Sequence, residues 1–156
     1  LPANSKVIFT AHSLPQRIVT IEGNRYANEL RATAEAVAAA AGLSHWSRWA
    51  TAWQSAARTP EPWLGPDILT VIDELAEAEN QANQSRGILV SAAGFVADHL
   101  EVLYDLDREA AGVCQEIGVA MVRAVTWKTQ GRSSVTNSRR ATKPASSEAP
   151  SKLGNA

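Results

Sequence analysis

Short apolar, β-branched runs alternate with helix-forming segments along the first 125 residues. Lys6–Thr10 and Arg86–Ala92 have the composition of buried strands, and Trp46–Trp53 alternates bulky and small residues as a strand does. Asn28–Ala41 is rich in strong helix formers and is followed by Gly42, a residue favoured just past helix ends. This alternation predicts an α/β fold: a doubly wound parallel sheet with helices on both faces.

Two more helices follow from the pattern in the second half of the chain. Pro66 and Asp67 suit the first turn of a helix that reaches about Ala78. The polar segment Glu79–Ser85 reads as a linker into the third strand. A long helix is predicted over Asp98–Ile117, closed by Gly118.

From Trp127 onward the hydrophobic periodicity disappears, and Ser, Thr, Arg, Pro and Ala dominate. Such a segment cannot bury enough apolar surface to offset its ordering entropy. We therefore predict one folded domain over residues 1–125 and a disordered tail over residues 126–156. The tail carries a net charge of +5 and the remainder −6.

The composition excludes several classes of protein. An acidic body and a short basic tail are not a nucleic-acid-binding footprint. Cys114 is the one cysteine, so an intrachain disulfide, a multi-thiolate metal centre and an iron–sulfur cluster held by this chain alone are excluded. We see no membrane span and no signal peptide, and we expect a monomeric cytoplasmic protein. Because the chain starts at Leu1, we interpret it as a piece of a longer protein.

Candidate chemistry lies just beyond two of the predicted strands. His12 follows the first strand, and Glu101 lies in the helix that follows the third. Ligands of open α/β sheets bind beyond the carboxyl ends of the strands. An imidazole facing a carboxylate suits a divalent first-row metal or proton transfer near neutral pH. We predict that both side chains face one cleft, about 5–8 Å apart. The alternative for His12 is a hydrogen-bonded structural histidine.

Glu101, Asp105 and Glu109 are spaced four residues apart and form one stripe of a helix. Stacked carboxylates repel one another unless a cation or water lies between them. We expect Asp105 and Glu109 to point toward solvent, away from the face packed by Leu103 and Leu106. Two alternatives remain: a solvated helix face, or a capping box in which Glu101 reaches back to Asp98.

Trp63 stands between Pro62 and Leu64-Gly65-Pro66, which makes its indole rigid. A rigid indole suits contact with a large flat ligand, although tryptophans more often form the core or a pocket wall.

The combination of motifs resembles the C-terminal half of the ferrochelatases, the type II chelatases that insert Fe²⁺ into a porphyrin. Four stretches carry the resemblance, in the order of the family: Phe9–Pro15, Trp53–Ser55, Thr59–Asp67 and Gly94–Asp107 followed by Glu109 and Ala110. With the segments between them they span residues 7–125. The version without cysteine ligands is most similar to the soluble bacterial enzymes.

The resemblance implies a role for each motif. His12 would bind metal or accept pyrrole protons, and Glu101 would face it across the porphyrin cleft. Asp105 and Glu109 would form an outer metal site with Ser55. Ser13 and Trp63 would contact the substrate.

The resemblance also implies the reaction and the partners. The substrates would be Fe²⁺ and coproporphyrin III or protoporphyrin IX, with no permanently bound cofactor. The partner would be the missing N-terminal half of the same enzyme. The alternative is a non-catalytic remnant that at most binds porphyrin or metal. A related cobalt chelatase fits less well, because we expect a second histidine as its partner ligand.

Three departures from the family pattern stand out. The turn Gly23–Tyr26 comes late and lacks the usual Asp or Pro. The interval from His12 to Glu101 is longer than expected, with Glu79–Ser85 as the expected insertion. The family pattern predicts that the C-terminal end continues as a strand, an Arg-containing loop and a final amphipathic helix, and after Arg123 and Ala124 the sequence does not do so.

Overall fold

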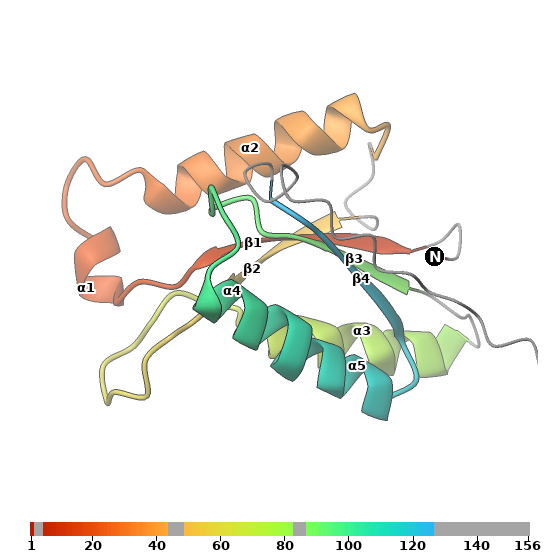
Figure 1. The fold of residues 1–156 in the computed structure, drawn as a ribbon. Coiled ribbons are helices and arrows are strands. Elements are labelled where there is room, and N and C mark those ends of the chain that lie inside the picture. The colour runs from red at the N-terminus through yellow and green to blue at the C-terminus, as the bar shows by residue number, and fades with distance from the viewer. Residues whose placement is uncertain (2–4, 44–48, 83–86, 127–156) are drawn as a thin grey trace, which may run out of the picture.

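The computed structural model describes residue 1 and residues 5–43, 49–82 and 87–126. Its elements follow one another as β1 (Lys6–His12), α1 (Gln16–Val19), α2 (Tyr26–Ala40), β2 (Trp49–Gln54), α3 (Ile68–Ala82), β3 (Gly87–Ser91), α4 (Leu100–Tyr104), η2 (Asp105–Ala110), α5 (Ala111–Glu116) and β4 (Ala120–Ala124). The segment η2 is a turn of π-helix that joins α4 to α5 without a break (Figure 1). No helix in the described ranges is long and apolar enough to cross a membrane.

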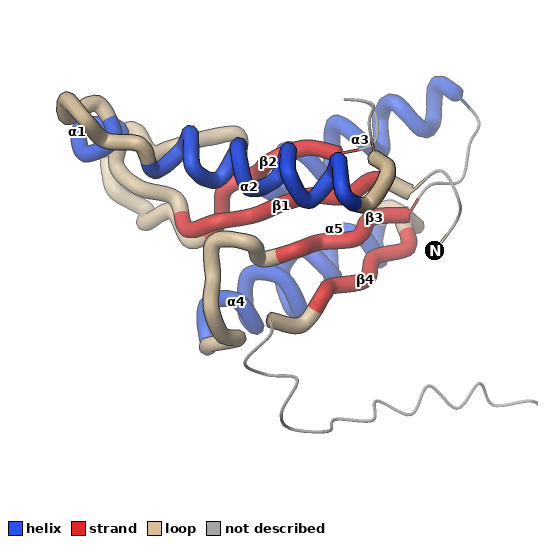
Figure 2. The backbone as a smooth tube through the Cα atoms, turned by 90° about the horizontal axis from the view of Figure 1, so that it is seen from above, coloured by secondary structure: helices blue, strands red, loops and turns tan. Residues whose placement is uncertain are grey.

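The four described strands form one parallel sheet in the order β2-β1-β3-β4. Helix α2 covers one face, and α3 with the α4–η2–α5 helix covers the other (Figure 1). The view from above shows the strands side by side beneath α2 (Figure 2). The predicted α/β class and the parallel sheet with helices on both faces are confirmed.

The main hydrophobic core lies between the sheet and the helices α3 and α4–η2–α5. Each of the two helical segments contributes a buried stripe: Ile68, Val71, Ile72 and Leu75 from α3, and Val102, Leu106, Ala110 and Cys114 from the second. The second stripe recurs every four residues, whereas an α-helix has about 3.6 residues per turn. A π-helix has more residues per turn than an α-helix. The π turn therefore compensates for the difference in period, and the buried stripe continues to face the sheet.

The opposite face is packed more closely by smaller side chains. Helix α2 buries Leu30, Ala34 and Ala38, spaced four residues apart. The two alanines let the helix approach Phe9 and Trp49 of the sheet, whose rings meet edge to face at 6.1 Å between centroids. The small side chains of Ala34 and Ala38 therefore determine how closely α2 packs on β1 and β2.

The observed bounds correct two of the predicted elements. Helix α3 begins at Ile68, not Pro66, because Asp67 caps it by accepting a hydrogen bond from the Leu69 N–H at 2.8 Å. The helix continues to Ala82, so the start of the predicted linker Glu79–Ser85 is helical. Residues 83–86 lie outside the described residues, as do 44–48 at the start of the predicted second strand.

The fourth strand was not predicted. Strand β4 lies at the edge of the sheet and alternates exposed and half-buried residues, with Arg123 as its fourth residue. An edge strand of this composition has a weak hydrophobic signal. The predicted disordered tail begins at Thr126, the last described residue, and residues 127–156 lie outside the described residues.

Candidate active site at the carboxyl ends of the strands

Parallel pairing brings the ends of β1 and β2 to the same edge of the sheet. His12 is the last residue of β1 and lies in register with Gln54, the last residue of β2. The chain leaving β3 crosses this edge before α4 begins. Residues that are distant in sequence therefore meet at one edge, which is where ligands of such sheets bind.

Gly94 holds the β3–α4 loop against β1. Its N–H donates to the Thr10 carbonyl oxygen at 3.0 Å. A Cβ added here would lie 2.4 Å from the Ala11 Cβ, a distance that no side chain tolerates. Glycine therefore allows the loop to pass directly beside the strand that ends in His12.

The His12 Nε2 lies 3.7 Å from a carboxylate oxygen of Glu101. The predicted juxtaposition is confirmed, at a shorter distance than expected. The other ring nitrogen, Nδ1, lies 2.5 Å from the Ser13 carbonyl oxygen. A carbonyl can only accept a hydrogen bond, so the neutral ring carries its proton on Nδ1. The Nε2 lone pair is then directed at the side of the site that holds Glu101.

Glu101 lies between two imidazoles and is open to solvent. Its carboxylate is also 4.0 Å from the Nδ1 of His99, whose ring packs edge-on against Phe95. The side chain is 57% exposed. The capping-box alternative is wrong: the helix begins after His99 with no side-chain cap hydrogen bond. The Glu101 carboxylate thus contacts the two imidazoles and does not cap the helix.

Tyr26 contacts the backbone of His12 at the end of β1. It was not predicted as a site residue. Its hydroxyl donates to the His12 carbonyl oxygen at 2.8 Å, and its ring packs on Trp53 with centroids 5.6 Å apart. Burial raises the pKa of Tyr26, and the hydrogen bond to His12 lowers it by a smaller amount. In the sequence, the one indication of this role is that Tyr26 lies in the altered turn after the histidine motif.

The chain after His12 is fastened to the proline-rich loop that contains Trp63. Ser13 is fully buried and its hydroxyl donates to the Leu64 carbonyl oxygen at 2.8 Å. Trp63 is half-buried, and its indole N–H donates to the Thr59 hydroxyl at 2.8 Å. The geometry gives Ser13 a structural contact, and substrate contact by Ser13 or Trp63 stays a prediction.

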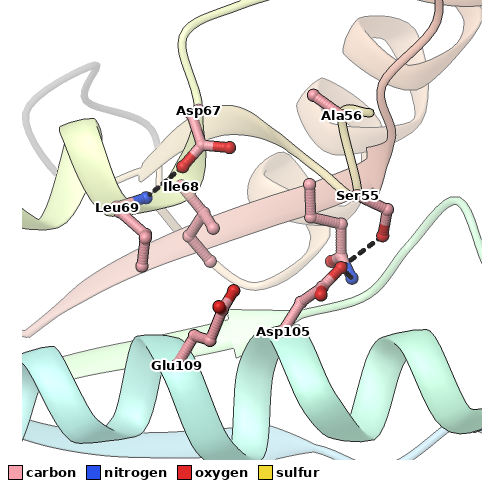
Figure 3. A pocket seen from close by; sticks show the side chains of 8 residues that line it. Ser55, Ala56, Asp67, Ile68, Leu69, Asp105 and Glu109 are labelled. Carbon is pink, nitrogen blue, oxygen red and sulfur yellow. Dashed lines mark hydrogen bonds between the residues drawn. The ribbon is translucent and has the colours of Figure 1, made fainter. Parts of the chain in front are cut away.

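A small pocket lies between the end of β2, the start of α3 and the π turn (Figure 3). One of its lining residues, Gln54, is the strand partner of His12. Its volume is about 110 Å³. It is lined by Gln54, Ser55, Ala56, Asp67, Ile68, Leu69, Asp105 and Glu109. A cavity needs about 10–15 Å³ of such space to hold one water molecule, so the pocket has room for a small hydrated ion.

The polar groups of this pocket are arranged around Asp105. The Ser55 hydroxyl donates to the Asp105 carboxylate, and Gln54 Nε2 approaches the same oxygen at 3.4 Å. Ser55 has a φ of 62°, a left-handed conformation that is uncommon outside glycine. The Gln54 side-chain oxygen is buried, and no described residue donates to it. Strain and an unpaired polar atom at one pocket are typical of functional sites.

The expected orientation of the acidic stripe needs correction. Asp105 and Glu109 do point away from Leu106, but they face the pocket and are half-buried instead of projecting into solvent. Leu103 is 40% exposed and does not belong to the packed face. Gln54 and Asp67 also line the pocket. They were missed because the pairing of the end of β2 with His12 and with Asp67 is a tertiary contact, which no local pattern shows.

The described residues hold no cluster of three or more His, Cys, Asp or Glu side chains arranged to bind a metal ion. The donors occur instead as pairs: His12 with Glu101, and Asp105 with Glu109 on the next turns of the same helix. An imidazole lone pair and three carboxylates along one helix can accept protons and guide a cation. They do not form a closed, permanent metal centre.

Comparison with known proteins identifies the family. A family model described as Ferrochelatase matches residues 2–132. The chain is 42% identical over 120 residues to the coproporphyrin III ferrochelatase of Oceanobacillus iheyensis, covering 77% of this chain and 36% of that protein. It is 45% identical to the ferrochelatase of Deinococcus radiodurans over 75% of this chain and 35% of that one. The chain therefore belongs to the ferrochelatase family.

The chain spans about a third of the length of these curated relatives. Among solved structures, a putative cobalamin (vitamin B12) biosynthesis CbiX protein from Marinobacter aquaeolei VT8 aligns with a TM-score of 0.46. It is 19% identical and covers 81% of this chain and 80% of its own. That similarity is slight, and the family assignment rests on the sequence matches.

Proposed function

We propose that this chain supplies the metal-inserting half of a ferrochelatase, which places Fe²⁺ into a porphyrin in heme biosynthesis. The observation that carries the proposal is the His12 Nε2 lone pair, held 3.7 Å from the Glu101 carboxylate at the edge of the sheet. The porphyrin is coproporphyrin III or protoporphyrin IX, and relatives named for coproporphyrin III favour the first.

Proton removal is the step that His12 and Glu101 suit. A free-base porphyrin must lose both inner N–H protons as the metal enters. His12 Nε2 accepts one proton and becomes an imidazolium, whose charge the nearby carboxylate stabilises; after it passes this proton to solvent, it accepts the second. Glu101 is more than half exposed, so protons can pass from this pair to solvent.

Delivery of Fe²⁺ is the step that the adjoining pocket suits. Asp105 and Glu109 place oxygen donors in a space of about 110 Å³, beside the Ser55 hydroxyl and the unpaired oxygen of Gln54. Weak oxygen ligands let a divalent ion enter and leave, as a transferred substrate must. The ion would then pass along the helix from Glu109 through Asp105 to Glu101. No cofactor is held permanently in this scheme.

A porphyrin is far larger than the pocket that Asp105 and Glu109 line in the described part of the chain. Ligand sites usually bury most of a ligand of that size, and the pocket here is far smaller. The remaining wall comes from the other part of the enzyme, which we propose is its N-terminal half. The isolated chain should therefore bind porphyrin weakly and insert iron slowly or not at all.

A second candidate is a remnant that binds porphyrin or metal without catalysis. The observation that favours it is the turn Gly23–Tyr26 after the histidine motif, which departs from the family pattern. In the remnant, the His12–Glu101 geometry is inherited from the family but no longer completes a catalytic site. Both candidates predict porphyrin contact, so only metallation distinguishes them.

A chimera separates the two candidates. The matching segment of the Thermus thermophilus ferrochelatase, 43% identical over 123 residues, would be replaced by residues 5–126 of this chain. Under anaerobic Fe²⁺ we expect the absorbance change from free-base to metalloporphyrin. His12→Ala and Glu101→Gln should each lower the rate by about 10²-fold or more. Glu29→Gln, on an exposed turn of α2, is the matched control and should change nothing.

A folded chimera that binds porphyrin but never metallates it would reject the enzyme and leave the remnant. A chimera that metallates equally well with His12→Ala would reject the assignment of the base while keeping the reaction.

A further inference from the structure

One guanidinium, that of Arg123 in β4, joins two aspartates that flank Glu101. Its Nη1 donates to Asp98 at 2.8 Å. Its Nε and Nη2 donate to the two oxygens of Asp107, at 2.6 and 2.9 Å. Asp98 precedes the first turn of α4, and Asp107 lies in the π turn. The edge strand is thus bonded to both sides of the turn that presents Glu101.

Most of this network is withdrawn from water. The side chains of Arg123 and Asp98 are 10% and 4% exposed, and only Asp107 is substantially open at 42%. The hydrogen bond to Asp107 is the largest cause that raises the pKa of Arg123. Removing one member of a buried pair leaves an uncompensated charge, so the network resists rearrangement. A bidentate guanidinium–carboxylate pair also fixes direction as well as distance.

The first turn of α4 is not capped by the side chain of its N-cap residue. Its N-cap, His99, makes no side-chain cap hydrogen bond, and Asp98 directs its carboxylate to Arg123 instead. The hydrogen bond from the Leu103 N–H to the His99 carbonyl, at 3.0 Å, closes the turn that contains Glu101. With no cap, the orientation of this turn depends on what holds Asp98.

We propose that Arg123 is a positioning residue that sets the direction of Glu101 toward His12. It holds the loop at Asp98, three residues before Glu101, while Gly94 holds the same loop against β1. The loop is therefore fixed at both ends, and the distance of 3.7 Å between His12 and Glu101 follows from the two attachments. The inference rests on the proposed function, because the role of Glu101 is part of it.

The competing explanation is that the network only stabilises the fold. In that case its loss lowers stability everywhere and leaves the active-site geometry of the folded molecules unchanged. The two explanations differ in where the backbone loosens and in which kinetic constant changes.

The first measurement uses the 156-residue chain and needs no activity. Amide hydrogen exchange would be followed by NMR in Arg123→Met and Asp98→Asn, with Arg108→Met, an exposed arginine of the π turn, as the matched control. We expect protection of the Leu103 amide to fall about tenfold more than that of amides in β1 and β2. A uniform loss, or no loss, in both variants would overturn the proposal.

The second measurement uses the chimera. Arg123→Met and Asp98→Asn should each lower kcat by about tenfold or more, because a misplacement of about 1 Å can cost up to 10²-fold. KM for porphyrin should stay unchanged, and the double variant should lose no more than either single one. Arg123→Lys keeps the charge and should restore part of kcat. Val119→Ala, a buried change next to β4, should lower stability and leave kcat intact.

The outcomes separate this inference from the proposed function. A parent chimera that never metallates rejects the function, and the exchange data then decide whether Arg123 fixes α4. An active parent whose kcat is unchanged in folded Asp98→Asn rejects the positioning role. If Arg123→Met does not fold, Asp98→Asn tests the same link with the guanidinium in place.

Discussion

At the scale of single residues, His12 acquires its chemistry from the backbone around it. The Ser13 carbonyl accepts from Nδ1 and so determines which nitrogen is free, while Tyr26 bonds the His12 carbonyl and limits movement of the strand end. The residue types at these positions do not reveal either contact. The sequence predicted that His12 matters, and the structure adds which atom of it is available.

Gly94 gives a prediction at this scale. Gly94→Ala would force a Cβ to within 2.4 Å of the Ala11 Cβ, so the loop or the strand must move. We expect a loss of about 1–3 kcal/mol in the free energy of unfolding, measured with urea. Gly112→Ala is the matched control: the added Cβ meets nothing within 4 Å, and a helical Gly→Ala change should stabilise by about 0.5–1 kcal/mol. Equal effects at the two glycines would contradict the close packing at Gly94.

At the scale of elements, the long helix from Leu100 to Glu116 carries both a buried stripe and the acidic row. Residues recurring every four positions run ahead of an α-helix by about 40° at each step, so four of them would not share one face. The π turn over Asp105–Ala110 restores the alignment. Asp105 and Glu109 consequently stay beside the pocket while Leu106 and Ala110 stay in the core.

Leucines on the two sides of this helix should respond differently to truncation. Leu106 is fully buried, so Leu106→Ala should cost about 2–5 kcal/mol of unfolding free energy. Leu103 is 40% exposed, and Leu103→Ala should cost less than about 1 kcal/mol. Thermal and urea unfolding of the two variants would measure the difference. Comparable losses would mean that the π turn does not direct the helix as described.

What the sequence could predict follows from how local each signal is. The strand β1, the helix α2 and the juxtaposition of His12 and Glu101 came from strong local patterns combined with the rule about strand ends. The true end of α3, the edge strand β4 and the pairing of Asp98 with Arg123 depend on contacts between distant segments. A polar helix end and an arginine inside a strand give no local hydrophobic signal.

At the scale of the whole molecule, the sheet order determines which segments form the site. Strand β1 is central, with β2 and β3 on either side, so the loops after these three strands meet at one edge. The His12–Glu101 pair arises between β1 and β3, and the Asp105–Glu109 pocket arises beneath the end of β2. Two sites with different donors thus lie along one helix.

The chimera can test whether the Asp105–Glu109 pocket acts in Fe²⁺ delivery and not in porphyrin binding. Asp105→Asn combined with Glu109→Gln should raise the KM for Fe²⁺ by about tenfold, because two of the three carboxylates that line the pocket are lost and only Asp67 keeps its charge. Affinity for porphyrin, followed by fluorescence quenching, should stay the same. Asp73→Asn with Glu77→Gln, the same residue types four apart on an exposed part of α3, is the matched control. If the rate of the double variant depended on the Fe²⁺ concentration as that of the parent does, the acidic row would be only a solvated surface.

The central position of β1 has a consequence for folding. Both neighbours of β1 pair with it in parallel, and the strands are connected through helices. The contacts that bring His12 to Glu101 and Ser55 to Asp105 therefore join segments far apart in sequence. Chain closure must be completed before any of these contacts forms, which makes such topologies slow to fold. His12 and Glu101 then come together only in the folded state. A ligand bound between them stabilises that state alone, by about 2.7 kcal/mol at a hundredfold excess over its Kd. Occupancy of the site and survival of the fold are therefore thermodynamically linked.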